Sequence, residues 1–259
     1  MGMEIKLSRL QAGGGNVRQS EAGWRLELPA AKQRVYRLAQ LDDYAGLPRN
    51  RLKHAPPWGF QVRARVSEQQ LPGTWGFGLW NDPFGLSLGF GTGNPARLPA
   101  LPQTAWFMFA SPPNWLSLRD DPEMVPANGF FAGTFRSPQV SSWLLAPALL
   151  ALPLCTIRPV SRAFRRAAAR IAQQAAAPIK ADVTQWHQYS MQWTQGNCKF
   201  SVDGQEILCS ASSPRPPLGI VLWIDNQYAA WTPAGRLGYG MLPGTAAWLD
   251  IADLAIQTG

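Results

Sequence analysis

The sequence predicts an all-β protein, a sandwich of two antiparallel sheets, on three observations. Charged residues make up 15% of the 259 residues, against roughly 25% in ordinary soluble proteins. The chain also holds 24 Gly and 23 Pro, and short runs of alternating apolar and polar residues lie between Pro/Gly-rich segments. One hairpin is visible from its turn, Asp203-Gly204, whose residues suit the positive φ of a two-residue loop. The length suits one large β domain.

The alternating runs predict where the strands lie. They are at 24–28, 35–44, 60–66, 76–82, 106–110, 189–194, 219–226 and 248–256. A run at 86–91 makes a weaker strand, because glycine weakens a strand interior. We therefore expect a flexible N-terminal segment at 1–20 and a single β-sandwich domain at 21–259, with an insertion at 143–178.

The insertion breaks the β pattern because its apolar residues recur with helical spacing. From Pro159 to about Ala177 an amphipathic helix is expected. Its apolar face comprises Val160, Phe164, Ala167, Ala168, Ile171 and Ala175, and its basic face Arg158, Arg162, Arg165, Arg166 and Arg170. Because the apolar face is mostly alanine, we favour a helix that covers the sandwich and leaves its arginines in solvent. The alternative is docking on an anionic membrane or a partner, with Trp143 inserted.

The segment from Trp186 to Leu208 carries a family resemblance. A strand with Trp186, Tyr189 and Trp193-Thr194 leads into the hairpin of Phe200, Val202 and Asp203-Gly204. This resembles the W-x-x-Y-x-x-x-W-[ST] strand and F-x-V-D-G hairpin of concanavalin A-like lectin/glucanase domains, including laminarinase-like hydrolases and laminin-G-like modules. The resemblance is most specific over 186–256. It implies a jelly-roll sandwich whose concave sheet holds saccharide.

Alternation sorts each strand into a core side and an opposite side. If the strands share a sheet, the opposite side gathers Asp42, Tyr44, Arg63, Arg65, Trp80, Asp82, Trp106, Trp223 and Asp225. We expect a ligand to stack on the three indoles, with Asn226 and Tyr228 helping to orient it. Gly76 and Gly78 would let that ligand approach the backbone. In the competing interpretation, a loop or the insertion covers this face and the indoles form a second core.

The catalytic motif of the resembling hydrolases is missing. Retaining enzymes of that kind carry E-x-D-x-x-E or E-x-D-x-E on the strand after a G-x-W-P-A-x-W-like strand. The run 73–80 is similar to the first strand, but 106–110 contains no acid. We therefore expect a non-hydrolytic protein that binds a glycan or another ring-bearing ligand. One alternative is an enzyme with Asp82 and Asp225 as an atypical acid pair, and another is a peripheral membrane or partner-docking module working through the basic helix.

Charge and hydropathy limit the binding partners and the cellular location that we expect for this protein. The formal net charge is +8, but five arginines lie within 158–170, so a nucleic-acid-binding surface is not expected. The longest apolar run, 143–155, contains two prolines and is shorter than the roughly 20 residues that span a bilayer. The start lacks the apolar stretch of a secretory signal. The expected location is cytoplasmic, with membrane association as an option.

The sequence predicts neither a zinc site nor a disulfide bond. Two histidines make no zinc cluster, whereas the paired acids Asp42-Asp43 and Asp120-Asp121 leave calcium as the one cofactor option. Counting outward from the turn places Cys198 opposite Cys209, at a hydrogen-bonded pair too wide for a disulfide. We expect free thiols and a reducing compartment.

Overall fold

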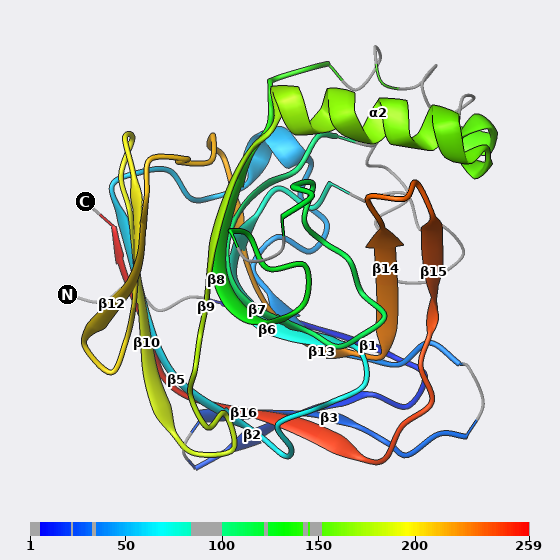
Figure 1. Ribbon diagram of the computed structural model, residues 1–259. Helices are drawn as coiled ribbons and strands as arrows, with labels where there is room; N and C mark the ends of the chain where they lie inside the picture. The colour runs from blue at the N-terminus through cyan, green and yellow to red at the C-terminus, as the bar shows by residue number, and fades with distance from the viewer. Residues whose placement is uncertain are drawn as a thin grey trace.

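The computed structural model describes residues 6–21, 23–32, 35–83, 100–121, 124–141, 145 and 152–258. The protein is a sandwich of two seven-stranded antiparallel sheets (Figure 1). Sheet A has the order β1 (Ser8–Ala12), β4 (Leu38–Asp42), β13 (Gly219–Asp225), β6 (Thr74–Trp80), β7 (Gln103–Ala110), β8 (Gly129–Arg136), β9 (Gln173–Pro178). Sheet B has the order β12 (Gln205–Ser210), β11 (Cys198–Val202), β10 (His187–Trp193), β5 (Trp58–Val66), β16 (Ala247–Thr258), β3 (Gly23–Leu28), β2 (Asn16–Ser20).

Smaller elements surround the hollow of sheet A, which curves so that one face is concave (Figure 1). The two-stranded sheet of β14 (Gln227–Trp231) and β15 (Leu237–Met241) stands beside it, and helix α2 (Arg158–Ile171) lies across the top. The short helices are η1 (Arg49–Arg51) and η2 (Leu152–Thr156). In the described part of the chain, these helices fall short of the length and apolar character needed to cross a bilayer.

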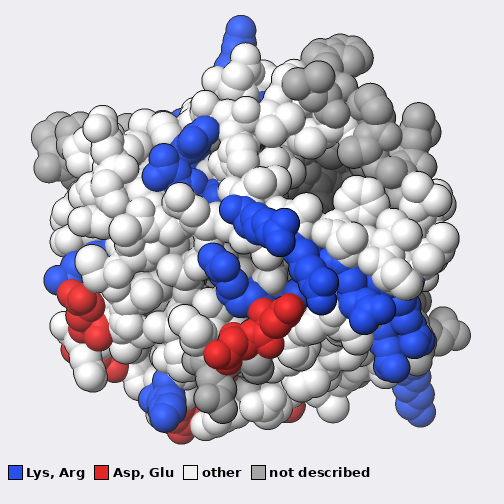
Figure 2. Space-filling view, turned by 45° about the horizontal axis from the view of Figure 1, so that its top comes forward, with Lys and Arg blue, Asp and Glu red and all other residues white. Residues whose placement is uncertain are grey.

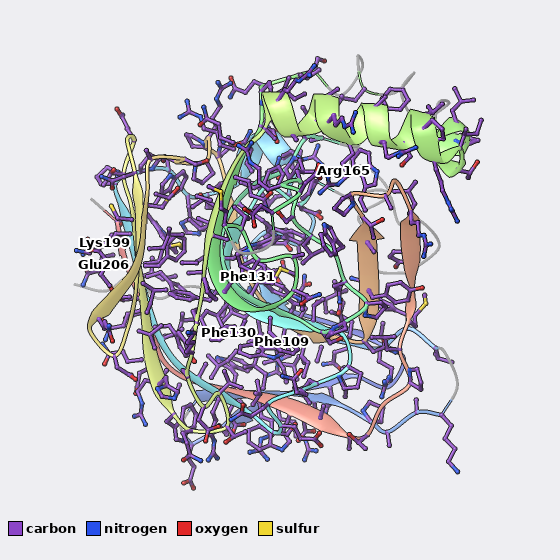
Figure 3. All side chains as sticks on the ribbon, in the orientation of Figure 1. Phe109, Phe130, Phe131, Arg165, Lys199 and Glu206 are labelled. Atoms are coloured by element: carbon purple, nitrogen blue, oxygen red, sulfur yellow. The ribbon has the colours of Figure 1, made fainter. Side chains whose placement is uncertain are left out.

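The main core lies between the two sheets, and alternation predicts which residues enter it. Phe60 and Val62 of β5 meet Phe77 of β6, with ring centroids of Phe60 and Phe77 6.1 Å apart. Trp75 packs at 4.7 Å from Phe130 of β8. In Figure 3, Phe109 and Phe130 point into this layer, whereas Phe131 points into the hollow of sheet A. The predicted jelly-roll sandwich is thus confirmed.

The N-terminal segment differs from the flexible arm expected at 1–20. Residues 8–12 pair with β4 in sheet A, and residues 16–20 pair with β3 in sheet B. The chain therefore joins the edges of both sheets. Because both strands are edge strands with alternating exposure, their sequence carries only a weak apolar signal.

The helix of the insertion is shorter than predicted. It ends at Ile171, where Ala172 donates its backbone N–H to Ala168. The following stretch forms β9, which pairs with β8 at the edge of sheet A. Alanine favours helix intrinsically, but pairing with an otherwise open strand edge outweighs that propensity here. The insertion therefore does not extend to 178, and the expected strand at 86–91 lies outside the described residues.

The β11–β12 hairpin confirms the predicted turn and corrects its register. Asp203 and Gly204 have φ of 51° and 80°. A bulge at Phe200/Ser201 then shifts the pairing, so Cys198 lies opposite Ser210 and Lys199 opposite Cys209. The two cysteines are therefore not partners across the ladder. Cys155, Cys198 and Cys209 are free thiols, as predicted.

Candidate functional site

Four aromatic rings form a row on the concave face of sheet A. Tyr44, just beyond β4, lies 6.2 Å from Trp80 of β6, measured between ring centroids. Trp80 lies 6.3 Å from Trp106 of β7, which lies 5.7 Å from Trp223 of β13. Three neighbouring strands thus bring together the tryptophans that the sequence places on one face. Their separations suit edge and offset contacts between rings.

A hydrogen-bond chain positions Trp80. Its indole Nε1 donates to the hydroxyl oxygen of Tyr44 at 2.6 Å. Gln40 Nε2 donates to Asp42 Oδ2 at 3.0 Å, and Asp42 Oδ1 accepts the backbone N–H of Tyr44 at 3.1 Å. Burial raises the pKa of the Asp42 carboxyl. Asp42 is only 2% exposed, so its carboxyl orients neighbouring groups and does not line the surface.

A second chain positions Trp223 at the other end of the row. Its Nε1 donates to Thr74 Oγ1 at 2.9 Å, and the Thr74 hydroxyl donates to Asp225 Oδ1 at 2.8 Å. Gln227 Nε2 donates to Asp225 Oδ2 at 2.6 Å. Burial raises the pKa of Asp225 to about 7. Sequence reasoning missed Thr74 and Gln227, because only the register of β13 against β6 brings Thr74 beside Asp225.

Gly76 and Gly78 do not open the backbone to a ligand, which corrects the expectation from sequence. A Cβ at Gly76 would lie 2.8 Å from Cη2 of Trp223, so that indole already occupies the space above the glycine. A Cβ at Gly78 would lie 2.8 Å from the Cβ of Trp106. Gly76 therefore accommodates the Trp223 indole, and both glycines allow close approach of the β7 backbone.

The concave face is covered at one side and accessible at the other. Met108 and Phe131 pack with Val125 and partly buried Leu116 in a second hydrophobic cluster, and Trp223 at 8% exposure belongs to it. Trp80 and Trp106 are only half-buried. The second-core interpretation therefore applies fully to Trp223 and in part to Trp80 and Trp106, which pack against the same cluster but retain some accessible surface.

Arg63 and Arg65 lie elsewhere, which corrects their expected place beside the tryptophans. Both belong to β5, which pairs with β10 and β16 in sheet B. Their guanidinium groups lie over the Trp186 ring, at 5.2 and 4.8 Å from its centroid. Alternation sorts the two faces of a strand but does not say which sheet the strand joins.

The expected acid pair does not form. Asp225 lies opposite Thr74 at the first residue of β6, whereas Asp82 follows the last residue of that strand. Trp80 lies six residues after Thr74 along the strand, a span of roughly 20 Å. Two carboxylates this far apart cannot act on one glycosidic bond.

Asn226 is a structural residue, contrary to the expectation that it orients a ligand. It has 0% exposure. Its Oδ1 accepts the backbone N–H of Arg37 at 2.8 Å, and its Nδ2 donates to two backbone carbonyls, of Val35 at 2.9 Å and Leu242 at 2.8 Å. Tyr228 is half-buried on β14, where its ring packs against Gly240.

The acidic pairs considered for calcium already have protein partners. Asp43 lies 2.7 Å from His54 Nε2 and accepts the backbone N–H of Ile220, while Asp120 pairs with Arg165. Within the described ranges, no group of three or more His, Cys, Asp or Glu residues has an arrangement that holds a metal ion.

Helix α2 is turned the opposite way from the sequence prediction. Its buried residues are Ser161 and Arg165, at 0% and 2% exposure, whereas Phe164 is 45% exposed. Arg158, Arg162, Arg166 and Arg170 are exposed as expected, and Trp143 lies outside the described residues. Hydrophobicity alone assigns an arginine to solvent, but the Arg165 guanidinium finds enough acceptors to be buried.

With this geometry in place, the arrangement can be set beside known structures. The chain is similar in fold to jelly-roll glucanases and lyases. One is an endo-β-1,4-glucuronan lyase from the fungus Trichoderma reesei, with 13% identity and a TM-score of 0.49, covering 97% of this chain and 90% of that one. Another is a Bacillus licheniformis β-glucanase, with 10% identity and a TM-score of 0.48, covering 98% and 92%.

A third is a glycoside hydrolase family 16 endo-glucanase from Bacteroides ovatus, with 12% identity and a TM-score of 0.48, covering 98% of this chain and 96% of that one. No model of a protein family matches the sequence, and a search of curated proteins found no match.

Proposed function

We propose that the concave face of sheet A binds a saccharide chain without cleaving it. The observation that carries this proposal is the half-buried pair Trp80 and Trp106, whose rings lie 6.3 Å apart on adjacent strands. The C–H faces of pyranose rings are apolar and pack on indole faces, and binding sites combine such aromatic surface with a few polar groups. Two neighbouring indoles suit a chain of sugars better than a single ring.

Preorganisation supports the same proposal. Trp80 is held through its Nε1 by Tyr44, and Trp106 contacts Trp80 on one side and Trp223 on the other. Both indoles rise from paired strands, so a ligand meets rings whose rotamers are already selected. Little side-chain freedom is then lost on binding.

The placement of carboxylates on this face supports binding without hydrolysis. The concave positions of β7 are Thr104, Trp106, Met108 and Ala110, none of them acidic. Asp42 lies opposite Val221, four residues from Asp225 along β13, which corresponds to roughly 13 Å. The two carboxyl groups of a glycosidase lie about 5 to 5.5 Å apart in retaining enzymes and about 6.5 to 9.5 Å apart in inverting ones. Among the described residues, Asp42 and Asp225 are too far apart for either mechanism.

Tryptophan fluorescence titration with neutral, uronate-containing and sulfated oligosaccharides tests the proposal. We expect saturable binding of at least one class, with Trp106→Ala lowering affinity at least tenfold because an aromatic contact is lost. Trp186→Ala, on the outer face of sheet B, is the matched control and should leave affinity unchanged. A flat titration across all three classes, or equal losses in both variants, contradicts the proposal.

A further inference from the structure

Helix α2 presents an apolar row and an arginine row to solvent, and its orientation is set by one buried side chain. Arg165 donates from Nε to the carbonyl oxygen of Trp231 at 2.9 Å, and from Nη2 to those of Ser117 and Arg119 at 2.9 and 3.1 Å. Its Nη1 also pairs with Asp120. With four acceptors the buried charge is satisfied, and the helix cannot roll without losing them.

A second hydrogen bond joins α2 to strand β14. Trp231 donates its indole N–H to Ser161 Oγ at 2.9 Å, one turn before Arg165. The fully buried residues of α2 are thus polar, with Ala168 and Ala169 partly buried beside them. The large apolar side chains Phe164 and Ile171 are left on the outside, the reverse of a helix that packs on a core.

The apolar row runs the length of the helix. Ile157, Phe164 and Ile171 are 51%, 45% and 56% exposed, and they recur every seven residues, so they lie along one line. Leu154 of η2, three residues before Ile157, is also 50% exposed. An unpaired strip of large apolar side chains on a soluble surface marks a contact site.

The arginine row lies on the other flank. Arg158, Arg162, Arg166 and Arg170 recur every four residues and are all exposed. Within the described part of the chain, none of the four forms an ion pair. Figure 2 shows a row of basic side chains crossing the face that carries α2.

We propose that α2 docks this protein on a lipid bilayer that contains anionic lipids. A helix lying in the plane of a bilayer buries its apolar side among the acyl chains while arginines reach phosphate groups. The line between the two rows is occupied by Ala163 and Ala167, which are small enough to let both rows approach one flat surface. The unpaired row of like charge complements an anionic surface, and the overall +8 charge adds long-range attraction.

Flotation of the full chain with vesicles tests the proposal. Vesicles of phosphatidylcholine alone are compared with vesicles that also contain phosphatidylglycerol. We expect flotation only with the anionic vesicles, weakened by high salt. Arg162→Gln with Arg166→Gln should lower partitioning at least tenfold, whereas Arg51→Gln with Lys180→Gln, two exposed cations elsewhere, should not. This control variant removes the same number of positive charges as the double substitution in α2.

A second pair of variants tests insertion. Phe164→Ser should lower flotation, whereas Val35→Ser, with a similarly exposed side chain at 47%, should not. Circular dichroism melting establishes that each variant is folded. Absence of flotation with anionic vesicles overturns the proposal in favour of a protein partner for α2, and equal losses in the matched charge pairs also overturn it. Trp106→Ala should float like the wild type, which separates this proposal from saccharide binding.

Discussion

Two groups of tryptophans lie on opposite sides of the sandwich and differ in the residues that contact their rings. On the concave face of sheet A, the rings of Trp80, Trp106 and Trp223 contact one another. On the outer face of sheet B, the guanidinium groups of Arg25, Arg63 and Arg65 lie over the rings of Trp186 and Trp248. The residue type is the same, and the neighbours decide its role.

The sheet B group is a closed ladder of cations and rings. Arg25 lies 4.5 Å from the Trp248 ring centroid, and Arg65 lies between Trp248 and Trp186 at 5.3 and 4.8 Å. Asp250 holds both guanidinium groups. These two rings remain partly exposed, and their contacts with the guanidinium groups contribute stability. In sheet A, by contrast, the N–H edges of Trp80 and Trp223 are bonded and the faces of Trp80 and Trp106 remain partly accessible.

Breaking the ladder should have the largest effect on stability. Asp250→Ala leaves Arg25 and Arg65 without their shared carboxylate, which is 10% exposed. We expect the free energy of unfolding to fall by about 2 to 3 kcal/mol. This is less than the roughly 3 to 5 kcal/mol lost when a fully buried ion pair is broken, because both arginines are about one-third exposed. Saccharide affinity should not change.

Urea denaturation measures this loss. Glu206→Ala is the control, because its pair with Lys199 is exposed on both sides and should contribute under about 1 kcal/mol. Similar losses in the two variants would show that Asp250 does not organise the ladder.

Overpacking beside Trp223 should have an intermediate effect. Gly76→Ala places a methyl group against the backbone carbonyl oxygen of Phe107 and 2.8 Å from Cη2 of that indole. We expect a loss of about 1 to 3 kcal/mol from overpacking, together with weaker saccharide binding because Trp106 loses its support. Gly196→Ala is the matched control, since a Cβ there meets nothing within 4 Å. Unchanged saccharide affinity in Gly76→Ala would exclude Trp223 as a support.

The last expected effect depends on pH and arises from one carboxyl group at the concave face. Burial raises the pKa of Asp225 to about 7 from 3.8, so between these values the native state keeps a proton that the unfolded chain has lost. The stabilisation from this group is therefore complete below pH 4 and declines as pH rises to about 7, by at most about 1.4 kcal/mol per pH unit.

Thermal unfolding of the wild type and Asp225→Asn across pH 4 to 8 checks this prediction. The difference in unfolding free energy between the two should vary through this window and become constant above it. Parallel pH curves would mean that Asp225 titrates normally in the folded protein.

Sequence patterns predicted the faces of strands well and their partners poorly. The alternation of Ile220, Leu222 and Ile224 assigns β13 correctly, and it leaves Trp223 on the concave face as observed. The same rule separates Arg63 and Arg65 from the core, yet it cannot place them in sheet B, because sheet membership is a long-range property of pairing.

Two further errors have local causes. Arg165 is buried because carbonyl groups of distant segments converge on it, and no pattern within the helix reports those acceptors. The extra residue in the β11–β12 ladder is Ile207, which fits the alternation of a strand as well as its neighbours do. A bulge therefore leaves no signal in apolar periodicity.

The bulge has a practical consequence for labelling. By separating Cys198 from Cys209, it leaves one thiol sealed in the core and the other on the outside. Burial raises the pKa of Cys198 to about 12, which suppresses its thiolate. A maleimide dye should therefore react first at Cys209 on the edge strand of sheet B, which places a fluorescent reporter on the sheet opposite the aromatic row.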